Sequence, residues 1–167
     1  VVYDQMTYYY TPPTMYPRSL TPKVDAERAS LPGDLRADRA VVYVHIPYCS
    51  ARCTFCPFQL DVGRSVPDQY VESLIRQAQM LTKQARVSSS FNIYFGGGSP
   101  NLLTVGQLQR LIEEIQLNFG GSAKEINVEL HPEVASQPGY LEDLARLGVN
   151  RVSFGFQTTD PKILRIT

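Results

Sequence analysis

From Ala40 onward, the sequence alternates short apolar runs with longer segments whose apolar residues recur at helical spacing. Each short run has the length and β-branched character of a buried strand, and the segments between them have the length of a helix with its turns. This alternation implies parallel strands joined by right-handed helical crossovers. The chain is therefore expected to form an α/β fold, either a small doubly wound sheet or the first half of a (β/α) barrel. The expected strands are 40–46, 91–95, 125–130 and 149–156.

Capping signals mark the helices between these strands. The segments 65–68 and 104–107 both have the spacing of a capping box, so each is expected to begin a helix. The apolar face of the first helix is expected to run as far as Ala85. Ser136 is expected to cap a third helix that Gly148 ends. The buried face of the second helix is expected to hold four apolar residues: Leu108, Leu111, Ile112 and Ile115.

Four unusual segments fall at the carboxyl ends of the expected strands. They are a cysteine-containing connection after residue 46, a triple glycine at 96–98, the residues after Leu130 and the end of the last strand. Ligands of parallel α/β folds gather at this edge of the sheet. The sequence therefore predicts a single active site formed by all four segments.

Residues 1–40 show no steady period and carry several prolines, which oppose helix interiors and central strands. They are expected to form an irregular arm with a short helix near 24–29, distinct from a core domain at 41–167. Five of the ten tyrosines lie in the first sixteen residues of this arm. Their side chains either pack against the domain or cover a substrate.

Charge and hydropathy exclude several kinds of partner. Sixteen basic residues balance sixteen acidic ones, whereas a general nucleic-acid binder needs a cationic surface. No apolar run approaches the roughly 20 residues of a membrane span. The first residues lack the basic start and apolar core of a signal peptide. We therefore expect a cytoplasmic protein that acts on a small molecule, without a nucleic-acid or membrane partner.

All three cysteines lie within eight residues, as Cys49, Cys53 and Cys56, in the spacing CxxxCxxC. Three clustered thiols are not a disulfide framework and indicate a reducing environment. Thiolates ligate iron–sulfur clusters, and a 4Fe–4S cluster has four irons to ligate. Three cysteines would leave one iron open to chelate a small molecule, as an open zinc position does in a catalytic site.

The spacing of the cysteines is also compatible with different roles. His45 with the three thiols would supply four ligands for structural zinc, although His45 lies within an expected strand. The cysteines could also be buried and inert, or belong to an electron carrier. A dedicated carrier would normally close the open iron with a fourth cysteine.

Four motifs in order carry a family resemblance: Tyr-Val-His-Ile-Pro-Tyr-Cys at 43–49, Tyr-Phe-Gly-Gly-Gly-Ser-Pro at 94–100, Glu-Leu-His-Pro at 129–132, and Gly-Val-Asn-Arg-Val-Ser-Phe-Gly-Phe-Gln at 148–157. With CxxxCxxC directly after a first strand, they resemble the radical S-adenosylmethionine superfamily and, within it, the oxygen-independent coproporphyrinogen III oxidase-like family. The resemblance implies a partial TIM-type barrel, of which the chain would hold about the first four strands. It would then be the N-terminal part of a longer enzyme or one part of a split protein.

The resemblance also implies cofactors and residue roles. The cysteines would hold a 4Fe–4S cluster whose open iron binds S-adenosylmethionine, and an electron from a donor such as flavodoxin or ferredoxin would yield a 5′-deoxyadenosyl radical. The same resemblance places two S-adenosylmethionine molecules in the site and leaves the catalytic side chains unassigned. The first molecule would lie near Tyr43, Phe55, Gly97, Gly98, Ser99 and Glu129, and the second near Gln157.

Each of these residues also has a purely structural interpretation. The glycines would serve a tight strand-to-helix turn, and both roles are compatible. Glu129 could face outward from its strand, and Tyr43 and Phe55 could be packing aromatics. Gln157 alone is an ordinary strand-end residue.

The family contains several activities. Coproporphyrinogen oxidases carry another cysteine two positions after the third, where this chain has Phe58. We therefore expect methyl or methylene transfer from a second S-adenosylmethionine to an sp² carbon of a small molecule, such as a natural product. The alternative is a porphyrin-related role: oxidative decarboxylation, heme-ring opening or a non-catalytic heme chaperone.

Overall fold

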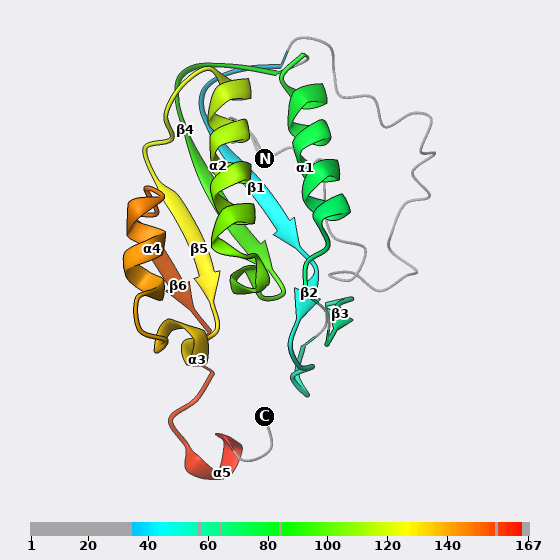
Figure 1. The fold of residues 1–167 in the computed structure, drawn as a ribbon, viewed down its shortest axis with the longest axis vertical. Helices are drawn as coiled ribbons and strands as arrows, with labels where there is room; N and C mark the ends of the chain where they lie inside the picture. Colours follow the sequence, from blue (N-terminus) through cyan, green and yellow to red (C-terminus); the bar gives the residue numbers. More distant parts are fainter. Residues whose placement is uncertain (1–34, 57, 64, 84, 156, 165–167) are drawn as a thin grey trace.

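The computed structural model describes residues 35–164 except residues 57, 64, 84 and 156. Its centre is a sheet of four strands in the order β1-β4-β5-β6, and every neighbouring pair is parallel. The expected alternation of strands and helices is thereby confirmed (Figure 1). The four strands are β1 (Leu35–Ile46), β4 (Ala85–Gly97), β5 (Ile126–Leu130) and β6 (Arg151–Phe154).

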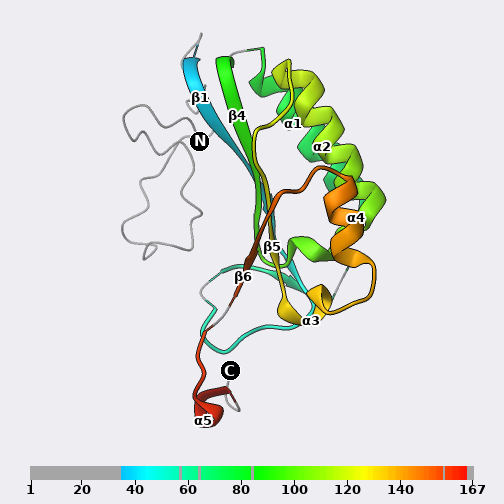
Figure 2. The same ribbon diagram turned by 90° about the vertical axis from the view of Figure 1, so that its left-hand side faces the viewer.

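The crossover helices distinguish the two architectures that the sequence left open. Figure 2 shows the helices α1 (Asp68–Leu81), α2 (Val105–Phe119) and α4 (Tyr140–Arg146) on the same side of the sheet. A doubly wound fold places helices on both faces. Strands in sequential order with their helices on one face are instead the arrangement of a (β/α) barrel segment. The described residues therefore form part of a TIM-type barrel.

Side-chain direction alternates along each strand, so the two faces of the sheet differ in chemistry. The face beneath the helices is apolar, and several of its side chains are completely buried, including Ile46, Ile93, Phe95 and Val128. Burying side chains of this size stabilises the fold by about 1.5–3 kcal/mol each. The helices contribute their own apolar faces to the same core.

The opposite face carries polar and aromatic side chains at alternate positions, among them Tyr43, Tyr94, Asn127, Glu129 and Ser153. Asn127 is 1% exposed, and both its amide nitrogen and its amide oxygen lie within hydrogen-bond distance of the Ser153 hydroxyl on the next strand. Among the described residues, no helix or strand covers this face. It has the composition of a ligand-facing barrel interior.

The expected start and buried face of α2 are confirmed. The Thr104 hydroxyl accepts from the backbone N–H of Gln107, and the Gln107 side chain accepts from the backbone N–H of Thr104. The Gln107 amide nitrogen also donates to the Val66 carbonyl and the Asp68 carboxylate, which joins the beginnings of α1 and α2. The four expected residues of the α2 face are buried: Leu108, Leu111, Ile112 and Ile115.

Two details of the first helix were predicted wrongly. The N-cap of α1 is Pro67, without a side-chain cap, so the Ser65–Asp68 capping box does not form. The carboxylate of Asp68 is instead hydrogen-bonded to Gln107. Helix α1 ends at Leu81, and Ala85 begins β4 because pairing with Leu35 on β1 outweighs its helical spacing.

The third crossover also differs from its expected form. It contains two short helices, α3 (Pro132–Ala135) and α4, and Ser136 is the C-cap of α3 rather than an N-cap. Helix α4 begins after Gly139, whose φ of 80° ends the intervening turn. Gly148, with a φ of 86°, follows α4 as expected.

The boundaries of the first and last strands also differ from expectation. β1 begins at Leu35 rather than Ala40, and the last strand is shorter than expected. Helix α5 (Pro161–Leu164) begins where a fourth helix was expected.

The expected arm, including its helix at 24–29, falls largely on residues 1–34, outside the described residues. In the part of the chain that is described, no helix has the length and apolarity needed to cross a membrane.

We predict that Gln107→Ala lowers the free energy of unfolding by about 1–2 kcal/mol, because it removes the capping box and unpairs two groups at the start of α1. Denaturant unfolding measures this loss. Gln109→Ala is the matched control, since the exposed Gln109 side chain only pairs with Glu113 along the helix. Its expected cost is about 0.2–0.5 kcal/mol. Equal losses in the two variants would contradict the bridging role of Gln107.

Candidate functional site

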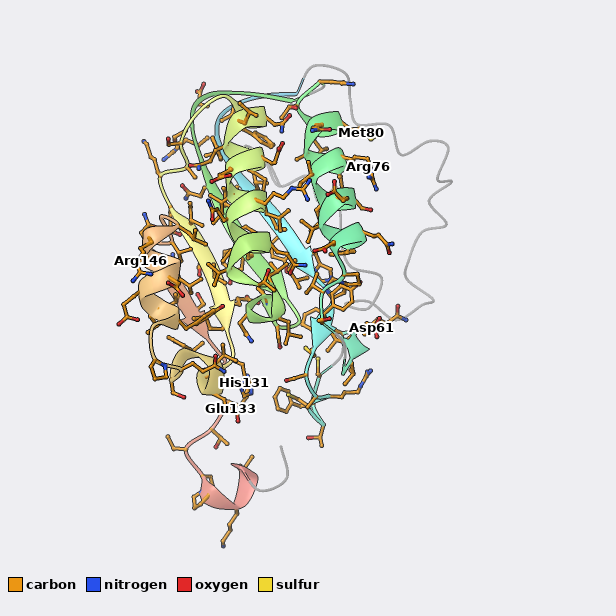
Figure 3. The ribbon with its side chains drawn as sticks, in the orientation of Figure 1. Asp61, Arg76, Met80, His131, Glu133 and Arg146 are labelled. Atoms are coloured by element: carbon orange, nitrogen blue, oxygen red, sulfur yellow. The ribbon has the colours of Figure 1, made fainter. Side chains whose placement is uncertain are left out.

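The carboxyl ends of the strands surround one cavity. In Figure 1 the arrowheads of β1, β4 and β5 point towards the end of the molecule that carries α3 and the short strands β2 (Tyr48–Cys49) and β3 (Asp61–Val62). Asp61 and His131 lie on two sides of this end (Figure 3). A cavity of about 680 Å³ opens there, lined by residues of the cysteine-containing loop, the turn after β4 and the ends of β5 and β6.

The segment between Ile46 and Gly63 carries all three cysteines and is called the cysteine loop below. It is anchored by a short parallel bridge that the sequence did not predict. β2 pairs with β3, with hydrogen bonds from Asp61 N–H to the Pro47 carbonyl at 2.8 Å and from Gly63 N–H to the Cys49 carbonyl at 2.9 Å. Cys49 is therefore held in a strand and is buried, whereas Cys53 is exposed and Cys56 is half-buried. The bridge includes Cys49 and closes the segment that carries Cys53 and Cys56.

All three cysteines are free thiols, and all three line the cavity. Within the described residues, no three His, Cys, Asp or Glu side chains are gathered so that they could hold one metal ion. His45 does not line the cavity either, which leaves the zinc alternative without its fourth ligand. Three thiols suit a 4Fe–4S cluster, whose cysteine ligands bind separate irons.

The glycine turn after β4 lies directly against the cysteine loop. The backbone N–H of Gly98 donates to the Ile46 carbonyl at 2.8 Å, and that of Ser99 donates to the Tyr48 carbonyl at 2.7 Å. A Cβ atom on Gly98 would lie 2.5 Å from the Tyr48 carbonyl oxygen and 3.0 Å from the Cys49 sulfur. A larger residue there would displace the loop or the thiol.

Two features of the structure require glycine at position 97. Its φ is +114°, and a Cβ atom there would lie 2.6 Å from Nδ1 of His45. The tight-turn interpretation of the triple glycine is therefore correct for its backbone. The turn also lines the cavity, so it remains compatible with ligand binding.

A hydroxyl from the same turn reaches the first cysteine. The Ser99 hydroxyl donates to the Cys49 sulfur at 3.3 Å. Burial raises the pKa of the Cys49 thiol, and this hydrogen bond opposes the increase because it favours the thiolate. Ser99 thus supports the charged form that a metal cluster requires.

Glu129 is half-buried at the end of β5 and lines the cavity, so it does not face outward. Its Oε1 atom accepts from the Tyr94 hydroxyl at 2.7 Å, and its Oε2 atom accepts from the Gly97 backbone N–H at 3.1 Å. These two donors come from β4, the neighbouring strand. The carboxylate is therefore fixed at the rim of the cavity.

Tyr43 belongs to the polar face beside this carboxylate. Its ring stacks on Tyr94 with the centroids 5.8 Å apart, and its hydroxyl lies 3.4 Å from Nδ1 of His45. Burial, together with the nearby Glu129, raises the pKa of Tyr43 to about 12. Burial lowers the pKa of His45, although Glu129 opposes this effect.

The structure brings nine of the ten expected site residues to one cavity. Tyr43 is the exception, because it lies on the strand face next to the cavity and does not line it. Phe55 lines the cavity but is 49% exposed, so it is not a core packing residue. The nine lining residues are Cys49, Cys53, Phe55, Cys56, Gly97, Gly98, Ser99, Glu129 and Gln157.

Sequence reasoning missed several residues of the site. Tyr94 binds Glu129 across the strands, and Ser153 and His131 line the cavity. Tyr94 belongs to the glycine motif, two residues before the triple glycine, so strand alternation would have placed it on the face of Gly96. Ser153 follows the same rule through its pairing with Glu129.

A model of the radical SAM superfamily matches residues 43–167. Two relatives illustrate the match. The chain is 35% identical over 132 residues to radical S-adenosyl methionine domain-containing protein 1, mitochondrial, of Danio rerio, covering 78% of this chain and 30% of that protein. It is 36% identical over 132 residues to heme chaperone HemW of Lactococcus lactis, covering 74% of this chain and 32% of that protein.

A solved structure shares the fold. Coproporphyrinogen III oxidase (HemN) from Escherichia coli, described as a radical SAM enzyme, matches with a TM-score of 0.62 and 29% identity, covering 81% of this chain and 31% of that chain. The chain thus spans about a third of the length of the relatives it matches. Together with the thiols and the glycine turn around one cavity, the family match over residues 43–167 shows that this chain belongs to the radical SAM superfamily.

Proposed function

We propose that this chain forms the part of a radical S-adenosylmethionine enzyme that holds the 4Fe–4S cluster and S-adenosylmethionine. The observation that carries the proposal is the single cavity lined by three free thiols, the glycine turn and the carboxylate of Glu129. The superfamily implies both cofactors, and these side chains have the chemistry that each cofactor needs.

Cys49, Cys53 and Cys56 would hold the cluster through three of its irons. When bound and reduced, the cluster supplies the electron that breaks a carbon–sulfur bond of S-adenosylmethionine. The chain itself contributes positioning and exclusion of water. Phe55, Phe58 and Leu60 line the cavity and contribute to the apolar part of its wall.

The turn and the carboxylate would orient S-adenosylmethionine. The backbone of Gly97 and Gly98, without Cβ atoms, permits close approach of the methionyl part. Each carboxylate oxygen of Glu129 accepts one hydrogen bond from the protein and retains further acceptor capacity. This capacity suits the ammonium group or the ribose hydroxyls of the cofactor.

For the substrate class, we favour a tetrapyrrole. The support comes from relatives named as a heme chaperone and as coproporphyrinogen III oxidases, which match over most of this chain. Methyl or methylene transfer, the first expectation from the sequence, has no comparable support among these relatives. It stays a second candidate because Gln157, expected beside a second S-adenosylmethionine, lines the cavity.

A small redox protein such as flavodoxin or ferredoxin would be the electron donor. The free thiols suit a reducing compartment. The sequence favoured the cytoplasm, whereas the name of the Danio rerio relative specifies mitochondria. Both compartments are reducing. Locating the tagged protein in cells would choose between them.

We predict that Gly98→Ala weakens cluster retention by about tenfold or more, because the new methyl group would meet Tyr48 and the Cys49 sulfur. Iron and sulfide that remain bound in the presence of a chelator measure retention. Gly106→Ala is the matched control, since nothing lies within 4 Å of a Cβ atom at Gly106 in α2. Retention equal to wild type in Gly98→Ala would contradict the proposed cluster position.

We also predict that the protein with a reconstituted, reduced cluster converts S-adenosylmethionine to 5′-deoxyadenosine, and that Cys53→Ala does not. Chromatography with coproporphyrinogen III, heme or candidate acceptors present measures the product. Consumption of a tetrapyrrole would support the favoured class, and a methylated product would support the second candidate. Heme binding without production of 5′-deoxyadenosine would identify a chaperone and would overturn the assignment to an enzyme. Absence of 5′-deoxyadenosine, of S-adenosylmethionine binding and of heme binding under several reductants would overturn the proposal.

A further inference from the structure

The carboxylate of Glu129 is held by two donors with different origins. The Gly97 donor is a backbone N–H that every residue at that position except proline would supply. The Tyr94 donor is a side-chain hydroxyl at 2.7 Å, from a residue 35 positions earlier in the sequence. Phenylalanine would fill the same place in the strand, so the hydroxyl group is the chemically specific part of this contact.

Gly96 provides an independent indication that the chain accommodates this pair. A Cβ atom at Gly96 would lie 2.9 Å from Cε1 of Tyr94 and 3.0 Å from Oε2 of Glu129. A residue with a Cβ atom would therefore displace the ring or the carboxylate from its present position. Unlike Gly97, Gly96 has no positive φ that would by itself demand glycine. The space it leaves is occupied by the hydrogen-bonded pair.

The surroundings of Tyr94 keep its hydroxyl in place and protonated. The ring stacks on Tyr43 at an interplanar angle of 25°. Burial, followed by the hydrogen bond to Glu129 and the charge of that carboxylate, raises the pKa of Tyr94, while Ser153 and Arg151 oppose the increase. A neutral phenol remains a hydrogen-bond donor at physiological pH.

We propose that Tyr94 is a positioning residue for S-adenosylmethionine: its hydroxyl holds the Glu129 carboxylate in the orientation in which that carboxylate accepts hydrogen bonds from the cofactor. This inference rests on the proposed function of the site. Tyr94 acts through Glu129 and needs no contact with the cofactor. Without the hydroxyl, Oε1 would lose its donor and the carboxylate could rotate about its side-chain bonds.

The test uses the cluster-loaded protein and S-adenosylmethionine itself as the probe. Tyr94→Phe keeps the stacked ring and removes one hydroxyl, so we expect the dissociation constant for S-adenosylmethionine to increase about three- to tenfold. Equilibrium dialysis measures it, and the change that bound S-adenosylmethionine produces in the electron paramagnetic resonance spectrum of the reduced cluster gives a second readout. Iron and sulfide content should equal that of wild type.

Tyr70→Phe is the matched control. It removes the same group, but the Tyr70 hydroxyl donates to the His45 carbonyl at 2.8 Å, away from the cavity lining. It should leave the affinity for S-adenosylmethionine unchanged. An equal loss of affinity in Tyr70→Phe would show a general effect of the missing hydroxyl on the fold and would overturn the inference.

A double-mutant cycle with Glu129→Gln separates positioning from an independent effect. If Tyr94 acts through Glu129, then Tyr94→Phe should weaken binding in wild type and have little further effect in Glu129→Gln. Equal losses in both backgrounds would overturn the inference, as would loss of the cluster in Tyr94→Phe. If wild type binds S-adenosylmethionine and Tyr94→Phe binds it equally, this inference alone fails. If wild type does not bind it, the proposed function fails as well.

Discussion

Parallel pairing of β1 with β4, continuous from Ala40–Phe91 to Ile46–Gly97, brings the cysteine loop and the glycine turn to the same point. The loop begins where β1 ends and the turn begins where β4 ends, so the aligned strand ends place both segments together. Hydrogen bonds then extend the contact past the strands, from Gly98 to Ile46 and from Ser99 to Tyr48. The contact of Ser99 with Cys49 depends on this alignment.

Much of the fold could be predicted because its signals are local. The buried face of α2 and its Thr104 cap lie within one helix, and a 3.6-residue period is visible without knowledge of the partner surface. The errors occurred where a local pattern competed with a distant contact. Ala85 continued the spacing of a helix but pairs with Leu35, and Asp68 had capping-box spacing but binds Gln107. The strands β2 and β3 have two residues each, which is too short for a periodic pattern of apolar residues, so they could not be predicted in this way.

The candidate site was predictable to the extent that it lies at strand ends. Chain order alone assigned the cysteine loop, the glycine turn and the segment after Leu130 to one edge, and the cavity is lined by residues of all three. Individual partners were not predictable. The hydrogen bond between Tyr94 and Glu129 depends on the relative register of β4 and β5, which no feature of either strand specifies by itself. The same is true of Tyr43, which stacks on Tyr94 instead of lining the cavity.

The alternation of the two sheet faces links correct folding to a correct site. A slip of β4 by one residue would turn Phe95 out of the core and direct Tyr94 towards the helices, because successive side chains point to opposite faces. Such a slip would bury a phenol without its carboxylate partner and expose a large apolar ring. The misregistered sheet is therefore less stable than the native sheet even without a cofactor, because its core is disrupted. Selection for a stable core thus also preserves the arrangement of the cofactor pocket.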